Sequence, residues 1–396
     1  MIRTPLHSLL PSIRVPIVSG PMGGAAGGSL AAQVTKAGGF GFIGGGYLTP
    51  SQMSEELQVV HSILGSPPPG QRTEIGVGFL GWKLSRLDKG IPEGANFDVG
   101  SRPKAFECID ATLKGFPRAI WLAFGTTEDL VGWAKAFRER EEVVNGKSRG
   151  DSWRLFVGVG SEQEARVAVE QVGADVVVAQ GEWVHISSML ICAESDALGR
   201  FCLFTGIEAG GHGNGSSPPL STLLPHIARL LPTYRPLDEN TKPLLLGAGG
   251  LSSGSHVISC LALGAVGAVY GTRFLLTPES CYPEPRKQIL LQAREGSTIR
   301  SMAFDEARNT LEWPQGVDGR GLRNATVADY EAGLGDSTGR QDTYARAEKQ
   351  GDAERLIVWA GTGVGNMDKI SPAGDVVREL EQEAIESLER VKSMSS

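Results

Sequence analysis

Short apolar runs alternate with amphipathic segments along most of this chain. The runs are apolar throughout and rich in β-branched and aromatic residues, which is typical of parallel strands buried on both faces. The segments between them carry apolar residues at helical spacing. The predicted strands are residues 15–22, 40–46, 75–80, 119–124, 155–160, 175–181, 243–249 and 265–275. The predicted helices are residues 29–37, 51–64, 104–114, 128–141, 162–172, 220–230, 253–263 and 284–293.

Strict alternation of eight strands with eight helices predicts an α/β fold, a closed (β/α)8 TIM barrel. A doubly wound open sheet is the alternative, but it seldom contains so many regular units. We assign residues 1–293 to the barrel and residues 294–396 to a C-terminal extension that packs on it. The extension is rich in Gly, Arg and Asp, and its last predicted element is an amphipathic helix over residues 375–391.

Residues 182–206 interrupt the regular pattern after the sixth predicted strand. This segment has neither a clear helical period nor turn residues, and unstructured loops longer than about 15 residues are uncommon in compact domains. We therefore expect an atypical insertion, either a lineage-specific loop or a translated intron. The codons for Gly181, Glu182 and Trp183 can contain a GTGAGT splice donor, and those for Thr205 and Gly206 can contain an ACAG acceptor. Sequencing of the cDNA distinguishes the two origins.

Composition narrows the classes of partner. The chain has 396 residues with 38 basic and 45 acidic side chains, a net charge of −7, which argues against binding to nucleic acid or to a membrane surface. Five scattered cysteines without a Cys-x-x-Cys pair favour a reducing compartment, and we expect the cytoplasm, with an organelle as an alternative. We expect no signal peptide, and the apolar stretch at 257–270 is too short to span a bilayer. The oligomeric state stays open.

Glycines are abundant at the carboxyl ends of the predicted strands, which in a (β/α)8 barrel meet on the catalytic face. Gly249 and Gly250 follow the seventh strand, and Gly271 and Thr272 follow the eighth. Barrels commonly bind phosphate at these two loops through backbone N–H groups, so we predict a phosphate site there. The alternative is that these glycines only permit tight turns.

The first and sixth strands lead into two further candidate sites. Pro21, Met22 and Gly23 follow the first strand, where a glycine lets the backbone approach a planar ligand and methionine offers an apolar surface. Gly211 and His212 follow the sixth strand in a loop with almost no apolar side chain that could bury an imidazole. A neutral imidazole can accept a proton from a carbon acid, so we predict that His212 is a base or a substrate anchor.

Metal and hydrolase chemistry receive little support from the residue spacing. No cysteine or carboxylate lies at ligand spacing near His212, so we expect no metal site. No Gly-x-Ser-x-Gly elbow follows a predicted strand. These residues alone leave open an isomerase or lyase that binds a phosphorylated substrate without a flavin.

Five motifs, in order along the chain, resemble those of the nitronate monooxygenases, formerly called 2-nitropropane dioxygenases. They are PIVSGPMGG at 16–24, VVVAQG at 176–181, EAGGHG at 208–213, GAGG at 247–250 and GTRFL at 271–275. The resemblance extends over residues 13–280, and the element that begins with Trp313 and Pro314 resembles eukaryotic members. It implies an FMN-dependent (β/α)8 barrel that oxidises alkyl nitronates or nitroalkanes with dioxygen to carbonyl compounds and nitrite.

The resemblance also implies roles for individual residues. Those that would contact the cofactor are Pro21, Met22, Gly23, Gln180, Gly211, Gly249, Gly250, Gly271 and Thr272. The first three would lie against the isoalloxazine, and Gln180 would hydrogen-bond the flavin. The last four would hold the phosphate. His212 would be the base or the anchor of the nitronate.

Three features depart from the family pattern. Many members have Asn at the position of Gly78 and Arg at the position of Gly213, and they lack residues 182–206. An NAD(P)H-dependent quinone or enoyl reductase on the same FMN barrel is therefore an alternative function. A catalytically impaired relative that is retained as a binding protein is another. If residues 182–206 are translated, we expect poor retention of FMN.

Overall fold

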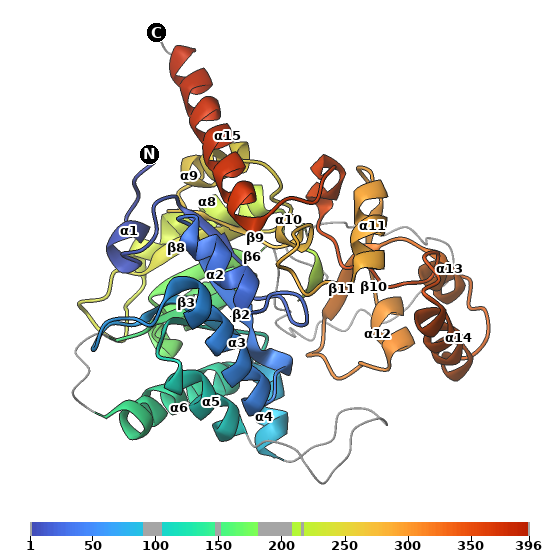
Figure 1. Cartoon of the computed structure of the whole chain (residues 1–396), viewed down its shortest axis with the longest axis horizontal. Coiled ribbons are helices and arrows are strands. Elements are labelled where there is room, and N and C mark those ends of the chain that lie inside the picture. Colours follow the sequence, from blue (N-terminus) through green and yellow to red (C-terminus); the bar gives the residue numbers. More distant parts are fainter. Residues whose placement is uncertain (1, 90–104, 147–151, 181–207, 215–217, 395–396) are drawn as a thin grey trace, which may run out of the picture.

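The computed structural model of this chain describes residues 2–89, 105–146, 152–180, 208–214 and 218–394. Eight parallel strands close into a barrel in the order β1-β2-β3-β4-β5-β6-β8-β9, which confirms the predicted fold class (Figure 1). The strands are β1 (Ile17–Ser19), β2 (Phe40–Gly44), β3 (Thr73–Leu80), β4 (Pro117–Ala123), β5 (Arg154–Val159), β6 (Val176–Gln180), β8 (Leu244–Ala248) and β9 (Ala268–Tyr270).

Helices between consecutive strands form the outer layer. They are α2 (Gly28–Lys36), α3 (Pro50–Leu64), α5 (Ala105–Lys114), α6 (Thr127–Asn145), α7 (Glu162–Val167) with η2 (Ala168–Val172), α8 (Leu220–Leu230) and α9 (Ser255–Ala262). Several begin at side-chain caps that the local sequence supplies. The Ser161 hydroxyl, for example, accepts a hydrogen bond from the Glu164 N–H at 3.1 Å at the start of α7.

The eighth position of the ring is filled by a helix from the C-terminal extension. The sequence analysis assigned this position to residues 284–293, and that assignment is wrong. Helix α11 (Glu284–Gln292) packs instead within the extension, where Leu290 is fully buried. Helix α15 (Ala373–Ser393) packs against α9 and α2, and its buried side chains join the core around the barrel (Figure 1). The amphipathic pattern of residues 375–391 is therefore that of a barrel helix.

The remaining extension is organised around a small antiparallel sheet of order β10-β11-β7. Its strands are β10 (Thr298–Ser301), β11 (Val317–Leu322) and β7 (Gly211–Asn214). The sequence analysis expected a loop at β7. Helices α12 (Ala303–Arg308), α13 (Ala325–Glu331) and α14 (Ser337–Gln350) lie beside this sheet in Figure 1, and η4 (Thr362–Asn366) precedes α15. Pairing of β7 with β11 joins the segment after the sixth barrel strand to the extension.

Short elements account for other differences from the predicted pattern. The run at 265–275 forms only β9, and its end turns into α10 (Thr272–Leu275). Helix α4 (Gly81–Asp88) follows β3 and was not predicted. Three further short elements are α1 (Leu6–Leu9), η1 (Gly45–Tyr47) and η3 (Leu231–Thr233). The proposed insertion at 182–206 lies outside the described residues.

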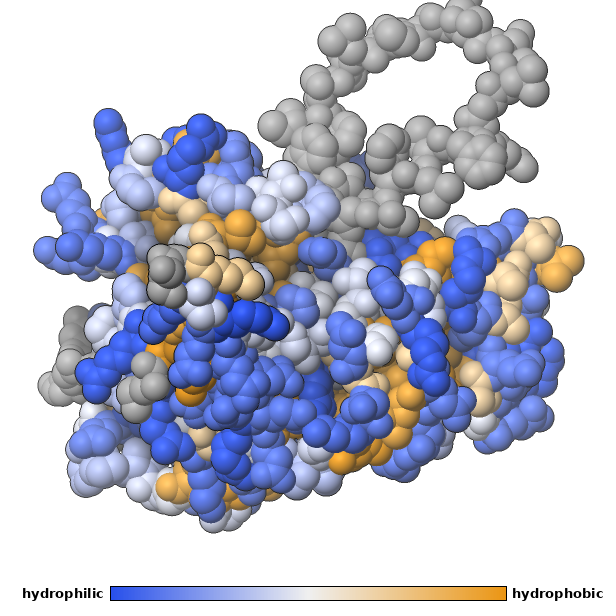
Figure 2. All heavy atoms as spheres, turned by 90° about the horizontal axis from the view of Figure 1, so that it is seen from above, coloured by the Kyte–Doolittle hydropathy of each residue, from blue (hydrophilic) through white to orange (hydrophobic). Residues whose placement is uncertain are grey.

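Hydrophilic residues cover most of the face that Figure 2 draws. Figure 2 shows one face on which hydrophobic residues form small groups between hydrophilic ones. In the described part of the chain, no helix combines the length and the apolar character that crossing a membrane requires.

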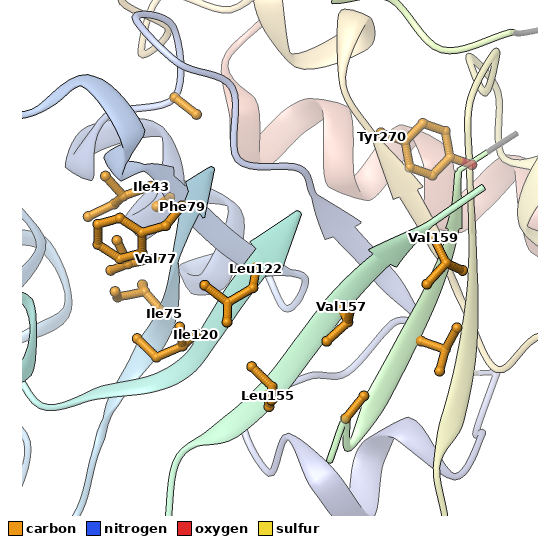
Figure 3. Close-up of a cluster of buried hydrophobic side chains, with 14 of the residues drawn as sticks. Ile43, Ile75, Val77, Phe79, Ile120, Leu122, Leu155, Val157, Val159 and Tyr270 are labelled. Atoms are coloured by element: carbon orange, nitrogen blue, oxygen red, sulfur yellow. The ribbon is translucent and has the colours of Figure 1, made fainter. Parts of the chain in front are cut away.

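The main hydrophobic core lies between the barrel strands and the helices. Side chains on the outer face of the strands, among them Val77, Leu122 and Val157, pack with buried residues of the surrounding helices (Figure 3). Burial of one such Val or Leu side chain contributes roughly 1.5–3 kcal/mol. Because alternate residues of a strand point to opposite faces, the same strands also supply the barrel interior.

A second hydrophobic core fills the interior of the barrel. Phe42 contacts Trp121 and Phe156 edge to face, with ring centroids 5.2 and 5.1 Å apart. Leu6, the first residue of α1, and Leu10, just after its end, are fully buried in the same cluster. Residue 76 is a glycine, and a Cβ at this position would lie 2.1 Å from the Phe42 ring. The interior is thus packed up to the carboxyl ends of the strands, where a cavity begins.

Candidate active site

A cavity of about 390 Å³ lies at the carboxyl ends of the barrel strands. All ten residues that the sequence analysis proposed for the site line this one cavity. They are Pro21, Met22, Gly23, Gln180, Gly211, His212, Gly249, Gly250, Gly271 and Thr272. The structure therefore brings them together, although their roles stay predictions.

The loop after β1 forms one wall of the cavity, and it packs directly on glycines at the ends of neighbouring strands. A Cβ on Gly44 would lie 2.4 Å from the Met22 carbonyl oxygen. A Cβ on Gly78 would lie 2.4 Å from the Pro21 Cβ. The loop sits this close to β2 and β3 because neither strand carries a side chain there. Gly78, the position of a family Asn, thus faces Pro21 instead of open space.

The loops after β8 and β9 form the predicted phosphate side. Gly249 and Gly250 have φ angles of +116° and +69°, values that residues other than glycine rarely adopt. The Thr272 hydroxyl accepts a hydrogen bond from the Gly361 N–H at 3.0 Å, so its own hydrogen remains available for donation. These positions are compatible with an anion held by backbone N–H groups and one hydroxyl.

His256 fixes the start of α9 behind this loop. Its Nδ1 accepts hydrogen bonds from the N–H groups of Ser252 and Ser253 at 3.1 and 3.2 Å. Burial lowers the pKa of His256, with nearby carboxylates opposing the shift, and a neutral ring is what this acceptor role requires. The two serine N–H groups are therefore engaged within the protein.

His212 lies on β7, opposite Gly319 of β11. Its Nε2 is 2.7 Å from the Asp305 Oδ1, and its ring stacks on Trp313 with centroids 3.7 Å apart and an interplanar angle of 11°. Burial lowers the pKa of His212 from 6.5, while the hydrogen bond and the charge of Asp305 oppose the shift. The imidazole is therefore neutral at neutral pH. Asp305 contacts its Nε2 edge, and Trp313 covers one face of the ring.

Asp305 is a residue that the sequence analysis missed. It lies on α12, 93 residues beyond His212, and its side chain is fully buried. The Thr310 hydroxyl donates a second hydrogen bond to the same oxygen at 2.9 Å. The sequence analysis considered only residues at metal-ligand spacing along the chain, and Asp305 is not one of them. Among the residues that the structure describes, no three His, Cys, Asp or Glu side chains are grouped for a metal ion.

Aromatic side chains form the wall beside His212. The Trp359 ring lies 5.0 Å from the imidazole, and Trp313 also contacts Phe124 edge to face at 5.6 Å. Arg308 lines the cavity with its guanidinium 5.8 Å from the Trp359 centroid. The wall is therefore apolar and flat, with one cation at its rim.

The extension closes the cavity over the barrel. The Thr362 N–H donates to the Glu208 carbonyl at 2.9 Å, and Gly361, Gly363 and Met367 line the cavity. The segment around η4 thereby contacts the loop that contains Glu208 and also forms part of the cavity wall. The sequence carried no signal for these contacts, because they join segments about 150 residues apart.

The family model for nitronate monooxygenase matches residues 4–72 and 192–383. A nitronate monooxygenase from the fungus Neurospora crassa is 30% identical over 410 residues, which cover 99% of this chain and 95% of that protein. This similarity confirms the resemblance to eukaryotic members. The second matched range begins inside the segment 182–206.

Two solved structures are similar over the whole chain. FabK from Thermotoga maritima has a TM-score of 0.69 at 22% identity and covers 100% of both chains. Nitroalkane oxidase from Streptomyces ansochromogenes has a TM-score of 0.65 at 25% identity and covers 98% of this chain and 99% of that chain. The likeness to FabK concerns the fold alone.

Proposed function

Because this chain belongs to the nitronate monooxygenase family, and is therefore an oxidoreductase, we propose that it oxidises alkyl nitronates and nitroalkanes with dioxygen. The proposed products are a carbonyl compound and nitrite, and the proposed cofactor is FMN. One observation carries the proposal: the ten residues that the resemblance assigns to cofactor and base line a single cavity.

The cavity walls suit a flat, phosphorylated cofactor. A Cβ on Gly24 or Gly211 would have no atom within 4 Å, so both backbones face open space and a planar ring could approach them closely. Gln180, at the end of β6, offers a carboxamide that can both donate and accept hydrogen bonds. The glycine loops after β8 and β9 offer N–H groups to a phosphate.

Separate groups of residues would contact the two ends of the cofactor. Pro21, Met22 and Gly23 would support the isoalloxazine, and Gln180 would orient it. Gly249, Gly250, Gly271 and Thr272 would hold the phosphate. Oxidation of the nitronate by dioxygen is the chemistry that bound FMN would supply.

His212 would move the proton. A nitroalkane has an acidic C–H next to the nitro group, and the nitronate forms when a base removes this proton. The neutral imidazole that burial favours is the form that can accept it. Trp313 and Trp359 would keep water away from the base and pack against the alkyl chain of the substrate.

The test compares His212→Asn with the unchanged protein, both purified and reconstituted with FMN. We expect the variant to bind FMN but to oxidise neutral 1-nitropropane about 10²-fold or more slowly. Oxidation of preformed propyl nitronate, which needs no base, should fall far less. Nitrite release and oxygen uptake measure both rates. Equal losses on the two substrates would leave His212 at most as an anchor.

His226→Asn is the matched control, because this histidine is exposed on α8, outside the cavity. Both rates should stay unchanged. Anaerobic bleaching of the flavin absorbance by NADH or NADPH, with none by propyl nitronate, would support the reductase alternative. A protein that stays colourless after reconstitution with FMN would overturn the proposal.

A further inference from the structure

The carboxylate of Asp305 and the imidazole of His212 form a hydrogen-bonded pair beside the cavity. The Asp305 side chain is fully buried, and the His212 side chain is 11% exposed. Their contact at 2.7 Å joins α12 of the extension to β7. In the part of the chain that the structure describes, no hydrogen-bond partner is found for Asp305 Oδ2. The Thr310 hydroxyl and the imidazole therefore share Oδ1.

Other charged groups face the imidazole from each packed element. Arg308 lies on α12 with Asp305, Arg300 lies on β10 and Asp318 lies on β11. Arg300 is hydrogen-bonded to the Asp318 carboxylate at 2.5 Å and also donates to the Gly213 carbonyl. Asp305 is thus the carboxylate in direct contact with the ring, and the two arginines oppose protonation of His212.

We propose that Asp305 is a positioning residue, which holds His212 in the tautomer with hydrogen on Nε2 and directs proton transfer to Nδ1. An ionised carboxylate can only accept hydrogen bonds, so the Nε2 facing it must carry the hydrogen. The stack on Trp313 holds the ring plane in place. Nδ1 then remains as the lone-pair nitrogen. This assignment rests on the proposed function only for the meaning of Nδ1 as a base.

The pair also makes His212 a stronger base than burial alone would allow. When Nδ1 accepts a proton from the substrate carbon, the ring becomes a cation between Asp305 and Trp313. The adjacent carboxylate stabilises this cation in a site from which water is largely excluded. The proton stays on Nδ1, and the electron pair of the broken C–H bond stays on the substrate as the nitronate.

The first test reports on the unchanged protein and requires no turnover. The full chain is reconstituted with FMN and labelled with ¹⁵N in its histidine rings, and the His212 signals are assigned by their loss in His212→Asn. We expect ¹⁵N chemical shifts of a neutral ring with hydrogen on Nε2 and none on Nδ1. The opposite tautomer in the unchanged protein would overturn the proposal.

The second test uses Asp305→Asn, which keeps the size of the side chain. The introduced amide group can donate to Nε2, so the tautomer with hydrogen on Nδ1 should become populated, and the pKa of His212 should fall further. Oxidation of 1-nitropropane should fall about 10²-fold, and oxidation of propyl nitronate by less than about threefold. Thr310→Val should cause a loss of about fivefold on 1-nitropropane alone, because Asp305 then loses one donor.

Asp329→Asn is the control. Asp329 forms an ion pair with Arg355 at 2.5 Å, on α13 of the same extension, and its loss should leave the His212 signals and both rates unchanged. An Asp305→Asn protein whose His212 tautomer and pKa match the unchanged protein would overturn the proposal. Failure of the proposed function looks different: NADH or NADPH, and not propyl nitronate, would bleach the flavin absorbance, while the ¹⁵N shifts would still report the pair.

Discussion

At the scale of single residues, two glycines that depart from the family pattern have neighbours that fill the space beside them. A Cβ on Gly78 would meet the Pro21 ring, and a Cβ on Gly213 would lie 3.1 Å from a guanidinium nitrogen of Arg300. The Arg300 guanidinium therefore lies next to position 213, where the family resemblance implies an arginine. The departures are therefore coupled to the residues packed against them.

Replacement of Gly78 by Ala should weaken FMN binding. The added Cβ would lie 2.4 and 2.5 Å from two ring carbons of Pro21, so the loop that would support the isoalloxazine must shift. Overpacking of this kind costs about 1–3 kcal/mol. We expect a dissociation constant for FMN at least about tenfold higher, measured by fluorescence titration of the apoprotein, together with lower thermal stability.

Gly132→Ala provides the control for this substitution. Gly132 lies within α6, and a Cβ there would have no atom within 4 Å. Ala in a helix interior is favoured over Gly by roughly 0.5–1 kcal/mol, so stability should rise slightly and FMN affinity should not change. If Gly78→Ala bound FMN as tightly as this control, the contact with Pro21 would not define the site.

The pH dependence of the reaction should reflect the buried imidazole. Because burial lowers the pKa of His212 below 6.5, the neutral base persists as the solution becomes mildly acidic. The rate of 1-nitropropane oxidation at subsaturating substrate should therefore be constant just above pH 6.5. It should fall only at lower pH, as His212 gains a proton. An acid limb centred above pH 6.5, measured by nitrite release, would contradict this environment.

At the scale of elements, the sequence predicted the barrel strands well because each is buried on both faces. Val176 to Ala179 are all fully buried in β6, so the run is continuously apolar and easy to recognise. Strand β7 contains Gly211 and Gly213 and has no such run. It is a strand because β11 supplies hydrogen-bond partners, which no local pattern can reveal.

Helix α15 shows the same limit in another way. Its amphipathic pattern predicted a helix, but a pattern does not specify what covers the apolar face. The structure shows that Gly254, before α9, allows close approach, since a Cβ there would lie 2.1 Å from the Leu380 carbonyl oxygen. The Gly254 N–H also donates to Glu383 at 2.6 Å. The helix that begins at residue 284, in contrast, packs within the extension and not in the ring of helices around the barrel.

Leu380→Ala should therefore destabilise the barrel itself. The side chain is 1% exposed and belongs to the core around the strands. Such a truncation lowers the free energy of unfolding by about 2–5 kcal/mol. Urea denaturation followed by circular dichroism measures the change. Leu334→Ala, at a leucine that is 59% exposed in the extension, should change it by less than about 0.5 kcal/mol. Similar effects of the two substitutions would exclude a structural role for α15 in the ring.

At the scale of the whole molecule, the fold explains which part of the site could be predicted. A parallel barrel delivers the ends of all its strands to one face, so residues as distant as Pro21 and Thr272 share a cavity. The barrel topology alone was therefore enough to predict that these residues lie close together. Trp359 lines the same cavity and Asp305 contacts His212 in its wall, both through the tertiary packing of the extension. Neither has a spacing relation to His212 that a sequence pattern could express.

Pairing of β7 with β11 has a consequence for synthesis of the protein. The ribosome completes every barrel strand by residue 270, yet Asp305, which contacts the imidazole, is translated 93 residues after His212, and Trp359 later still. A nascent polypeptide can thus complete all eight barrel strands before Asp305, which contacts the imidazole, and α15, which completes the ring of helices, have been synthesised. The contacts of His212 with Asp305 and Trp359 can therefore form only after most of the extension has been translated.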